Sequence, residues 1–233
     1  TAGFWAISRH EDVMAVATDP ATFCSSRGIL VSEIGTLYDS PPTMMHTDPP
    51  EHTRYRALVQ PAFSKRRMRL LEPDIRGRVR ALLDRFADGG TVDVVSEVAV
   101  PLPIEVISDL LGLEVATSRV LEWTEAAIPD TAGISDEERM ARLGEMLDHL
   151  VTTARERRSQ PRDDFISDLA AAELDGHQLS DEELAMFLIQ LLVAGNDTTR
   201  NAISHGVLAL SRYPEQRDKW WRNYHEVAPT AVE

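Results

Sequence analysis

The chain has 233 residues, of which 43% are hydrophobic and 27% are charged, a balance typical of a globular protein with a substantial core. Its formal net charge of −14 argues against a nucleic-acid partner, because phosphate binding requires concentrated Lys and Arg. The single cysteine, Cys24, excludes a disulfide framework and fits a reducing compartment. We find neither a signal peptide nor an apolar run long enough to cross a bilayer, and we therefore expect a cytoplasmic protein.

The first fifty residues combine short elements with a long loop. Weak alternation over residues 3–7 predicts a short strand, and residues 10–17 predict a helix that Asp19-Pro20 stops. Residues 25–50 are rich in Gly, Ser, Thr and Pro, which predicts a surface loop that can hold a short helix. Loops of this length inside a compact domain are often functional.

Helical patterns dominate from there on. Residues 91–95 are predicted to form a second short strand. Pro101 and Pro103 interrupt the segment that follows, so a helix is predicted over residues 104–111, and Gly112 is expected to end it. The fold class predicted by these patterns is mainly α, with small β elements near the N-terminus. Apolar residues at spacings of three and four predict a helix at Met68, Leu71, Ile75, Val79, Leu82 and Phe86, ended by Gly89-Gly90.

Two capping boxes mark the later helices. Ser135-x-x-Glu138 opens a helix through Val151 whose basic end, residues 155–158, suits the helix dipole. Ser180-x-x-Glu183 opens the longest helix, which Pro214 prevents from extending beyond about Tyr213. It should contain roughly 33 residues and span about 50 Å. Its middle is apolar nearly all round, which predicts passage through the core.

A basic segment interrupts the acidic chain between Arg54 and Arg85. It contains ten basic and three acidic residues, a net charge of +7. The segment is either a solvated helix face or a docking patch for an acidic partner, with residues 65–69 as its densest part.

The long central helix contains a polar turn at residues 194–199. Gly195 costs helix stability, and the Asp197 carboxylate is costly in a core unless it is partnered. Thr198 can donate to a carbonyl one turn earlier and bend the helix. The pattern predicts a helix distorted to face a cavity, and the alternative is a packing glycine beside an internally satisfied polar turn.

Two motifs together give the chain a family resemblance. Ala194-Gly195-Asn196-Asp197-Thr198-Thr199 is similar to the oxygen-binding helix of cytochromes P-450. Asp48-Pro49-Pro50-Glu51-His52-Thr53-Arg54-Tyr55-Arg56 resembles that family's Asp-Pro-Pro-x-His-x-x-x-Arg segment. The motifs occur in the family's order, about 140 residues apart. The resemblance implies a cytochrome P-450 fold, with residues 1–233 forming a single incomplete domain.

The resemblance also implies residue roles. His52 and Arg56 match the positions that bind haem propionates, and Met45 is a weaker candidate for contact with the haem plane. Ala194 and Gly195 match the small residues over the porphyrin. Asp197 and Thr198 match the acid and the alcohol that supply protons for oxygen activation.

The sequence lacks the family's axial cysteine loop and its Glu-x-x-Arg helix, both of which lie downstream of the long helix. Cys24 lies upstream and is not expected to be the iron ligand. The resemblance therefore implies the N-terminal part of a monooxygenase, inactive alone. The complete protein would use haem b and electrons from NAD(P)H through a ferredoxin reductase and a ferredoxin. Its substrate would be a small hydrophobic molecule such as a terpene, a sterol or a branched lipid.

Two other readings remain open at this point. One is a non-catalytic helical binding module, and the other is an inert truncated fragment. A variant of the first uses His46, Asp48, Glu51 and His52 as a divalent metal site, although Pro49-Pro50 constrains that loop and the spacing matches no metal motif.

Overall fold

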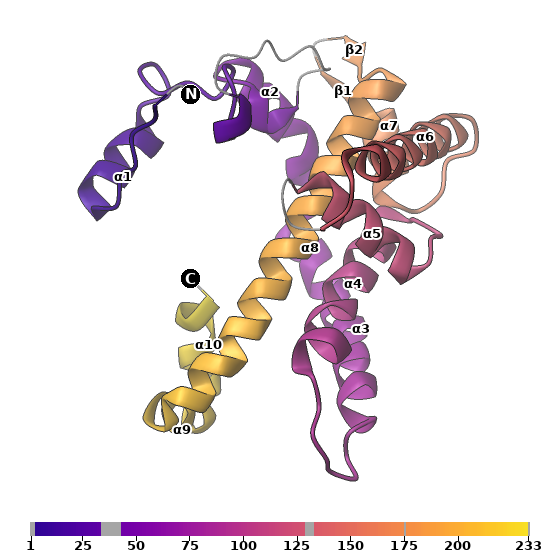
Figure 1. Ribbon diagram of the computed structural model, residues 1–233. Coiled ribbons are helices and arrows are strands. Elements are labelled where there is room, and N and C mark those ends of the chain that lie inside the picture. Colours follow the sequence, from indigo (N-terminus) through magenta and orange to yellow (C-terminus); the bar gives the residue numbers. More distant parts are fainter. Residues whose placement is uncertain (1–2, 34–42, 129–132, 175, 233) are drawn as a thin grey trace. The chain divides into compact units, whose positions relative to one another are not determined.

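The computed structural model describes residues 3–33, 43–128, 133–174 and 176–232, and part of the predicted loop, residues 34–42, lies outside them. The described chain is mainly helical, as predicted (Figure 1). It divides into two compact units, Thr1–Met68 with Gly144–Gln190 and Arg69–Leu143 with Leu191–Glu233. No helix in the described part is long and apolar enough to span a membrane.

The first unit is built around the start of the long helix α8. Buried Leu184, Phe187 and Leu188 of α8 form its core together with Phe165 of α7, which lies edge-on to Phe63 with ring centroids 5.6 Å apart. Its elements are α1 (His10–Thr18), η1 (Val31–Glu33), η2 (Met44–His46), α2 (Glu51–Val59), η3 (Gln60–Phe63), α7 (Phe165–Ala171), the antiparallel strands β1 (Glu173–Leu174) and β2 (His177–Gln178), and parts of α6 (Asp136–Ser159) and α8 (Asp181–Arg212).

The start of α8 is fixed from two sides. The Ser180 N–H donates to Glu183 Oε2 at 2.8 Å and the Glu183 N–H donates to Ser180 Oγ at 3.1 Å, which is the predicted capping box. Arg158 at the end of α6 donates to Asp181 Oδ1 at 2.8 Å and to the Leu179 carbonyl. The basic end of α6 thus binds the α8 N-terminus directly, in addition to suiting its own helix dipole.

The second unit packs α3, α4 and α5 with the rest of α8. Its core side chains are Ile104 and Leu111 of α4, Val120 and Trp123 of α5, and Leu192 of α8. Its elements are α3 (Lys65–Asp84, of which the first residues belong to the other unit), the π-helical turn η4 (Val95–Ala99), α4 (Pro101–Leu111), α5 (Thr117–Ala127), α9 (Pro214–Arg222) and α10 (Tyr224–Val232).

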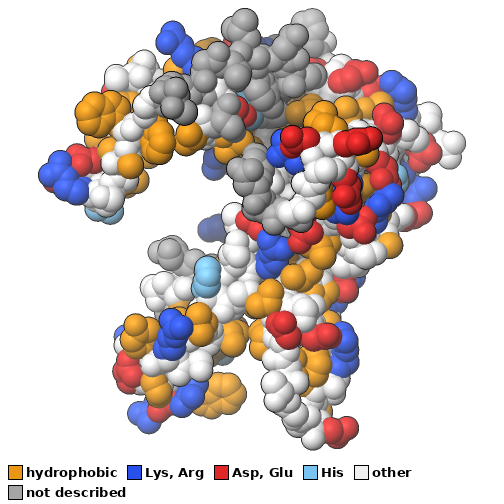
Figure 2. Space-filling view, viewed as in Figure 1, with side chains coloured by type: hydrophobic (Ala, Val, Ile, Leu, Met, Phe, Trp, Pro, Cys, Tyr) orange, Lys and Arg blue, Asp and Glu red, His pale blue; other side chains and the backbone are white. Residues whose placement is uncertain are grey.

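The strand predicted at residues 3–7 is not formed. Phe4 and Trp5 are 62% and 97% exposed, and Figure 2 shows hydrophobic side chains at the surface around α1. A strand needs a hydrogen-bonded neighbour, and no described segment pairs with residues 3–7. The only strands in the described ranges are β1 and β2, so the β structure occurs at residues 173–178 of the sequence and not in the N-terminal region where it was predicted.

The strand predicted at residues 91–95 is also wrong. The Asp93 carboxylate accepts from the N–H groups of Val95 at 2.9 Å and Ser96 at 3.2 Å, which starts a helical turn there. The next helix begins at Pro101 and not at residue 104, because a proline in the first helical turn loses no intrahelical hydrogen bond. It ends at Gly112, with φ +80°, as predicted.

Candidate active site

The polar turn at residues 194–199 lies inside a continuous helix. All its residues are α-helical, so the expected distortion does not interrupt α8. The Thr198 hydroxyl donates to the Ala194 carbonyl at 2.6 Å, which is the predicted bond to the preceding turn. Ala194 and Thr198 are both exposed and lie one turn apart on the same side of the helix.

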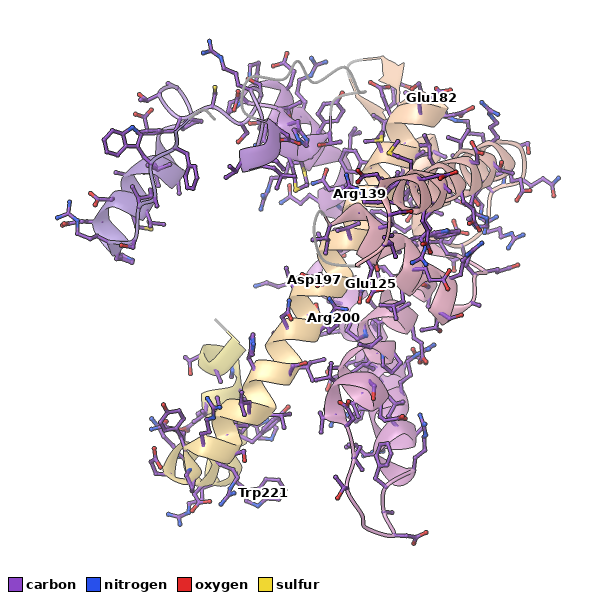
Figure 3. The ribbon with its side chains drawn as sticks, viewed as in Figure 1. Glu125, Arg139, Glu182, Asp197, Arg200 and Trp221 are labelled. Atoms are coloured by element: carbon purple, nitrogen blue, oxygen red, sulfur yellow. The ribbon has the colours of Figure 1, made fainter. Side chains whose placement is uncertain are left out.

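Asp197 leaves the helix in a different direction. Its Oδ1 accepts from Arg200 Nη2 at 2.5 Å and its Oδ2 accepts from Asn201 Nδ2 at 3.3 Å. The other terminal nitrogen of Arg200, Nη1, lies 3.8 Å from Glu125 Oε1 of α5. Figure 3 shows Asp197, Arg200 and Glu125 gathered where α8 and α5 meet. The acid and the alcohol thus have different surroundings, as expected for consecutive helix positions about 100° apart.

Gly195 packs closely against α4. A Cβ added at Gly195 would lie 3.2 Å from Ile107 Cδ1 and 3.3 Å from Ile107 Cγ1. Gly195 is therefore a packing glycine, which was one of the two alternatives that the sequence left open. The expected place of Ala194 and Gly195 beside a porphyrin stays a prediction, and the exposure of Ala194 fits it.

The start of α2 is anchored by Asp48. Its carboxylate accepts from the N–H of Ser25 at 2.7 Å and of Ser26 at 3.2 Å, next to Cys24. The Ser26 hydroxyl and these N–H groups lower the pKa of Asp48, and His52 contributes to the same shift. The Asp48 carboxylate therefore ties the Asp-Pro-Pro turn to residues 25–26 and fixes the position where the helix that carries His52 begins.

The two arginines of α2 have different surroundings. Arg54 is engaged in an interaction and borders a cavity of about 150 Å³ with Glu51, Tyr55 and Glu183. Within the described ranges, no side-chain hydrogen bond or ion pair engages the Arg56 guanidinium, which is exposed. It lies one turn after His52, which is half-buried.

This donor set fits a haem. A guanidinium fork and an imidazole one turn apart present N–H groups suited to carboxylates such as the haem propionates. Met45 of η2 is 44% exposed and available for apolar contact. His52, Arg56 and Met45 belong to the first unit, and the polar turn of α8 belongs to the second.

The divalent metal site is contradicted. His46 Nδ1 is 2.8 Å from Thr43 Oγ1, its Nε2 is 3.4 Å from Glu33 Oε1, and Asp48 is held by backbone N–H groups. No group of three or more His, Cys, Asp or Glu side chains in the described ranges could hold a metal ion. Hydrogen bonds within the loop engage two of the proposed ligands, His46 and Asp48, instead.

The basic segment is partly neutralised from within. Arg76 pairs with Glu72 and Arg78 with Asp74, each at 2.8 Å and one turn away. Arg78 also reaches Glu105 and Asp109 of α4, so it ties two helices together. Lys65 and Arg69 are exposed, while the side chains of residues 66 and 67 lie outside the described structure. Docking by residues 65–69 stays a prediction.

The sequence did not identify the partners of the polar turn. Asn196 is 1% exposed and donates to Thr124 of α5 at 2.8 Å, and Glu125 approaches Arg200. Asn196 is the first polar residue after the apolar run of residues 191–194, which is a visible signal in the sequence. Its partner on α5 lies 72 positions away, and α5 itself was not predicted.

Comparisons with known proteins point to one family. The family model "Cytochrome P450" matches residues 132–231. The methyl-branched lipid omega-hydroxylase of Mycobacterium tuberculosis is 39% identical over 243 residues, covering 99% of this chain and 56% of the relative. The linalool 8-monooxygenase of Pseudomonas putida is 34% identical, covering 93% and 57%.

A solved structure shares the fold. The Mycobacterium marinum cytochrome P450 in complex with pseudoionone superimposes with a TM-score of 0.81 at 35% identity, covering 96% of this chain and 56% of that one. The fold and the two motifs define a cytochrome P450 architecture. The chain belongs to the cytochrome P450 family and spans about half the length of the curated relatives it matches.

Proposed function

We propose that the complete protein is a haem-dependent monooxygenase that inserts one oxygen atom from dioxygen into a C–H bond. The balanced reaction consumes the substrate, dioxygen, two electrons and two protons, and it yields an alcohol and water. The observation that carries the proposal is the α8 turn, where a carboxylate and a hydroxyl on adjacent positions have separate surroundings. A reaction that consumes two protons needs groups that can supply them.

The cofactor is proposed to be haem b. His52 and Arg56 would hold its carboxylates, while Met45, Ala194 and Gly195 would lie against the ring. When bound, the haem iron supplies the dioxygen binding and electron transfer that these side chains cannot. Cys24, in the loop before α2, is not proposed as the iron ligand.

Asp197 and Thr198 are proposed to divide the proton chemistry. Asp197 is half-buried with one side toward solvent, so it can exchange protons with water. The Thr198 hydroxyl donates to the Ala194 carbonyl, so its oxygen would still accept a hydrogen bond and could pass a proton on toward the reactants.

The substrate is proposed to be a branched hydrophobic molecule. The names of the relatives refer to a methyl-branched lipid, a steroid and linalool, which share branched hydrocarbon skeletons. Electrons would come from NAD(P)H through a ferredoxin reductase and a ferredoxin. The acidic ferredoxin would dock on the basic residues 65–69, including exposed Lys65 and Arg69.

Haem retention in two arginine variants tests the cofactor assignment. In the complete protein, Arg56→Ala should lower the haem content after purification more than Arg54→Ala, because only Arg56 is unengaged by the described residues. The haem-to-protein absorbance ratio and the stability of both variants should be measured together. Equal haem content in two equally stable variants would contradict the assignment.

A further inference from the structure

Asn196 has a fixed side-chain orientation in the middle of the polar turn. Its Nδ2 donates to Thr124 Oγ1 at 2.8 Å. The Thr124 hydroxyl donates to the Leu121 carbonyl at 3.1 Å, so its oxygen acts as the acceptor toward Asn196. Because Thr124 Oγ1 accepts from Asn196, the amide nitrogen of Asn196 points toward α5. The amide oxygen, Oδ1, therefore needs a different hydrogen-bond donor.

No described residue donates to Asn196 Oδ1, although the side chain is 1% exposed. A buried acceptor without a donor is destabilising, because it has lost its hydrogen bonds to water and gained none in the protein. Asn196 borders a cavity of about 70 Å³, whose other walls are Thr124, Glu125, Ile128, Asp197 and Arg200. Since a water occupies about 30 Å³ of the liquid, the cavity has room for about two molecules. Its walls also offer the two to four polar partners that such a water needs.

We propose that this cavity holds ordered water and that Asn196 is a positioning residue for it. Asn196 Oδ1 accepts from the first water molecule, and the water hydrates the Asp197 carboxylate within the cavity. Thr124 holds the amide in the required orientation. Asn196 and Thr198 are two positions apart, about 200° around the helix, so the water site faces away from the hydroxyl side of the turn.

The water site supplies what Asp197 requires under the proposed function, on which this role rests. When Asp197 gives up a proton toward the reaction, it must take another from solvent. A neighbouring water passes one proton to the carboxylate and receives one from the next water or from bulk solvent, so no net charge accumulates. Arg200 and Asn201 already hold parts of this carboxylate, so the cavity is a direct route for the exchange.

Three substitutions in the complete protein separate this role from general packing. Asn196→Leu removes the acceptor and keeps the branching and the number of side-chain heavy atoms. Thr124→Val is a milder change that removes only the anchor of the amide. The matched control is Gln190→Leu. Gln190 is another buried amide of α8, 8% exposed, whose Oε1 also lacks a described donor, but it does not border this cavity.

Two measurements decide the proposal. A high-resolution crystal structure should show water within hydrogen-bond distance of Asn196 Oδ1 in the wild type and lose it in Asn196→Leu. The proton-dependent step should slow about tenfold in Asn196→Leu, with a larger solvent isotope effect. That is less than the 10²–10⁴-fold of complete acid–base loss, because solvent still reaches the carboxylate. Thr124→Val should show a smaller change in the same direction, and Gln190→Leu none.

An empty cavity, or a protein donor at Oδ1, would overturn the water site. An unchanged isotope effect in Asn196→Leu, or an equal effect in Gln190→Leu, would overturn the positioning role. If water is present but Asp197→Asn leaves the isotope effect unchanged, the water site stands and the catalytic assignment of Asp197 fails.

Discussion

Two arginine–aspartate ion pairs have similar N···O distances but very different surroundings. In the first unit, Arg157 Nε lies 2.6 Å from Asp164 Oδ2, and the two side chains are 4% and 8% exposed. On α8, Arg200 Nη2 lies 2.5 Å from Asp197 Oδ1, and the side chains are 21% and 29% exposed. Burial, and not the identity of the residues, distinguishes the pairs.

The buried pair is tied into the backbone. Asp164 accepts from the Ser167 N–H at 2.8 Å and so caps α7, which makes it part of the frame that holds the first unit together. The Asp197 pair caps no helix end and borders a cavity and solvent. The comparison predicts that the first pair serves stability and the second serves chemistry.

Breaking each pair at its arginine should give the largest contrast. Arg157→Met leaves the Asp164 charge buried without its partner and should lower the free energy of unfolding by about 3–5 kcal/mol. Arg200→Met should lower it by about 1 kcal/mol or less, because water can solvate the half-exposed Asp197. Urea unfolding of the two complete variants measures both values. Equal losses would show that burial does not separate the pairs.

Neutralising the acid of the second pair should impair the reaction and spare the fold. Asp197→Asn keeps the shape but cannot carry a proton, so the proton-dependent step should slow by about 10²-fold, at the lower end of the range for acid–base catalysis. The rate of NAD(P)H oxidation with substrate measures this effect. Asp164→Asn is the control, scored per folded molecule. A normal rate in Asp197→Asn would remove Asp197 from the proton supply.

Removing the alcohol should have a smaller and different effect. Thr198→Ala should lower the product formed per NAD(P)H by a factor of about 3–10, since water can partly replace the lost hydroxyl. Hydrogen peroxide release should rise to match, while oxygen uptake changes little. Thr199→Ala, one position on, is the control. If Thr198→Ala formed as much product per NAD(P)H as the wild type, the role of Thr198 would be purely structural.

The pH dependence of stability should give the smallest effect. Burial raises the pKa of the Asp164 carboxyl, but hydrogen bonds from Ser167 and Arg157 outweigh it and leave the pKa below its usual value. The unfolded chain therefore binds more protons in acid than the folded one. The contribution is present above the usual Asp pKa of about 3.9 and is lost as pH falls through the lowered pKa.

Asp164→Asn should accordingly flatten the acid limb of the stability curve. The slope should change by at most one proton, about 1.4 kcal/mol per pH unit. The exposed neighbouring variant Asp163→Asn is the matched control, because it removes one carboxyl and leaves the Arg157 pair intact. An acid limb that is equally steep in wild type and Asp164→Asn would contradict this account of the buried pair.

Local patterns in the sequence were sufficient for much of the fold. The Ser180–Glu183 capping box, the end of α4 at Gly112 and the bond from Thr198 to Ala194 all depend on residues within one or two turns, and each is present. The strand predicted at residues 91–95 failed, because the β-branched pattern concealed the capping side chain of Asp93.

The surroundings of the site could not be read in the same way. Thr124 and Glu125 approach α8 only because α5 packs on it, and no pattern links positions 72 apart in the chain. The different burial of Asp164 and Asp197 is also a product of tertiary packing. The motifs named the candidate residues, and the packing determined what each of them contacts.

Isotope-labelled dioxygen tests the central claim most directly. The complete protein, supplied with a ferredoxin, its reductase, NADPH and a methyl-branched fatty acid, should form a hydroxylated product carrying one ¹⁸O atom from ¹⁸O₂. Asp197→Asn should form the same labelled product more slowly. A product whose oxygen comes from water, no oxygenated product from any branched lipid, sterol or terpene offered, or an unchanged rate in Asp197→Asn would contradict the account.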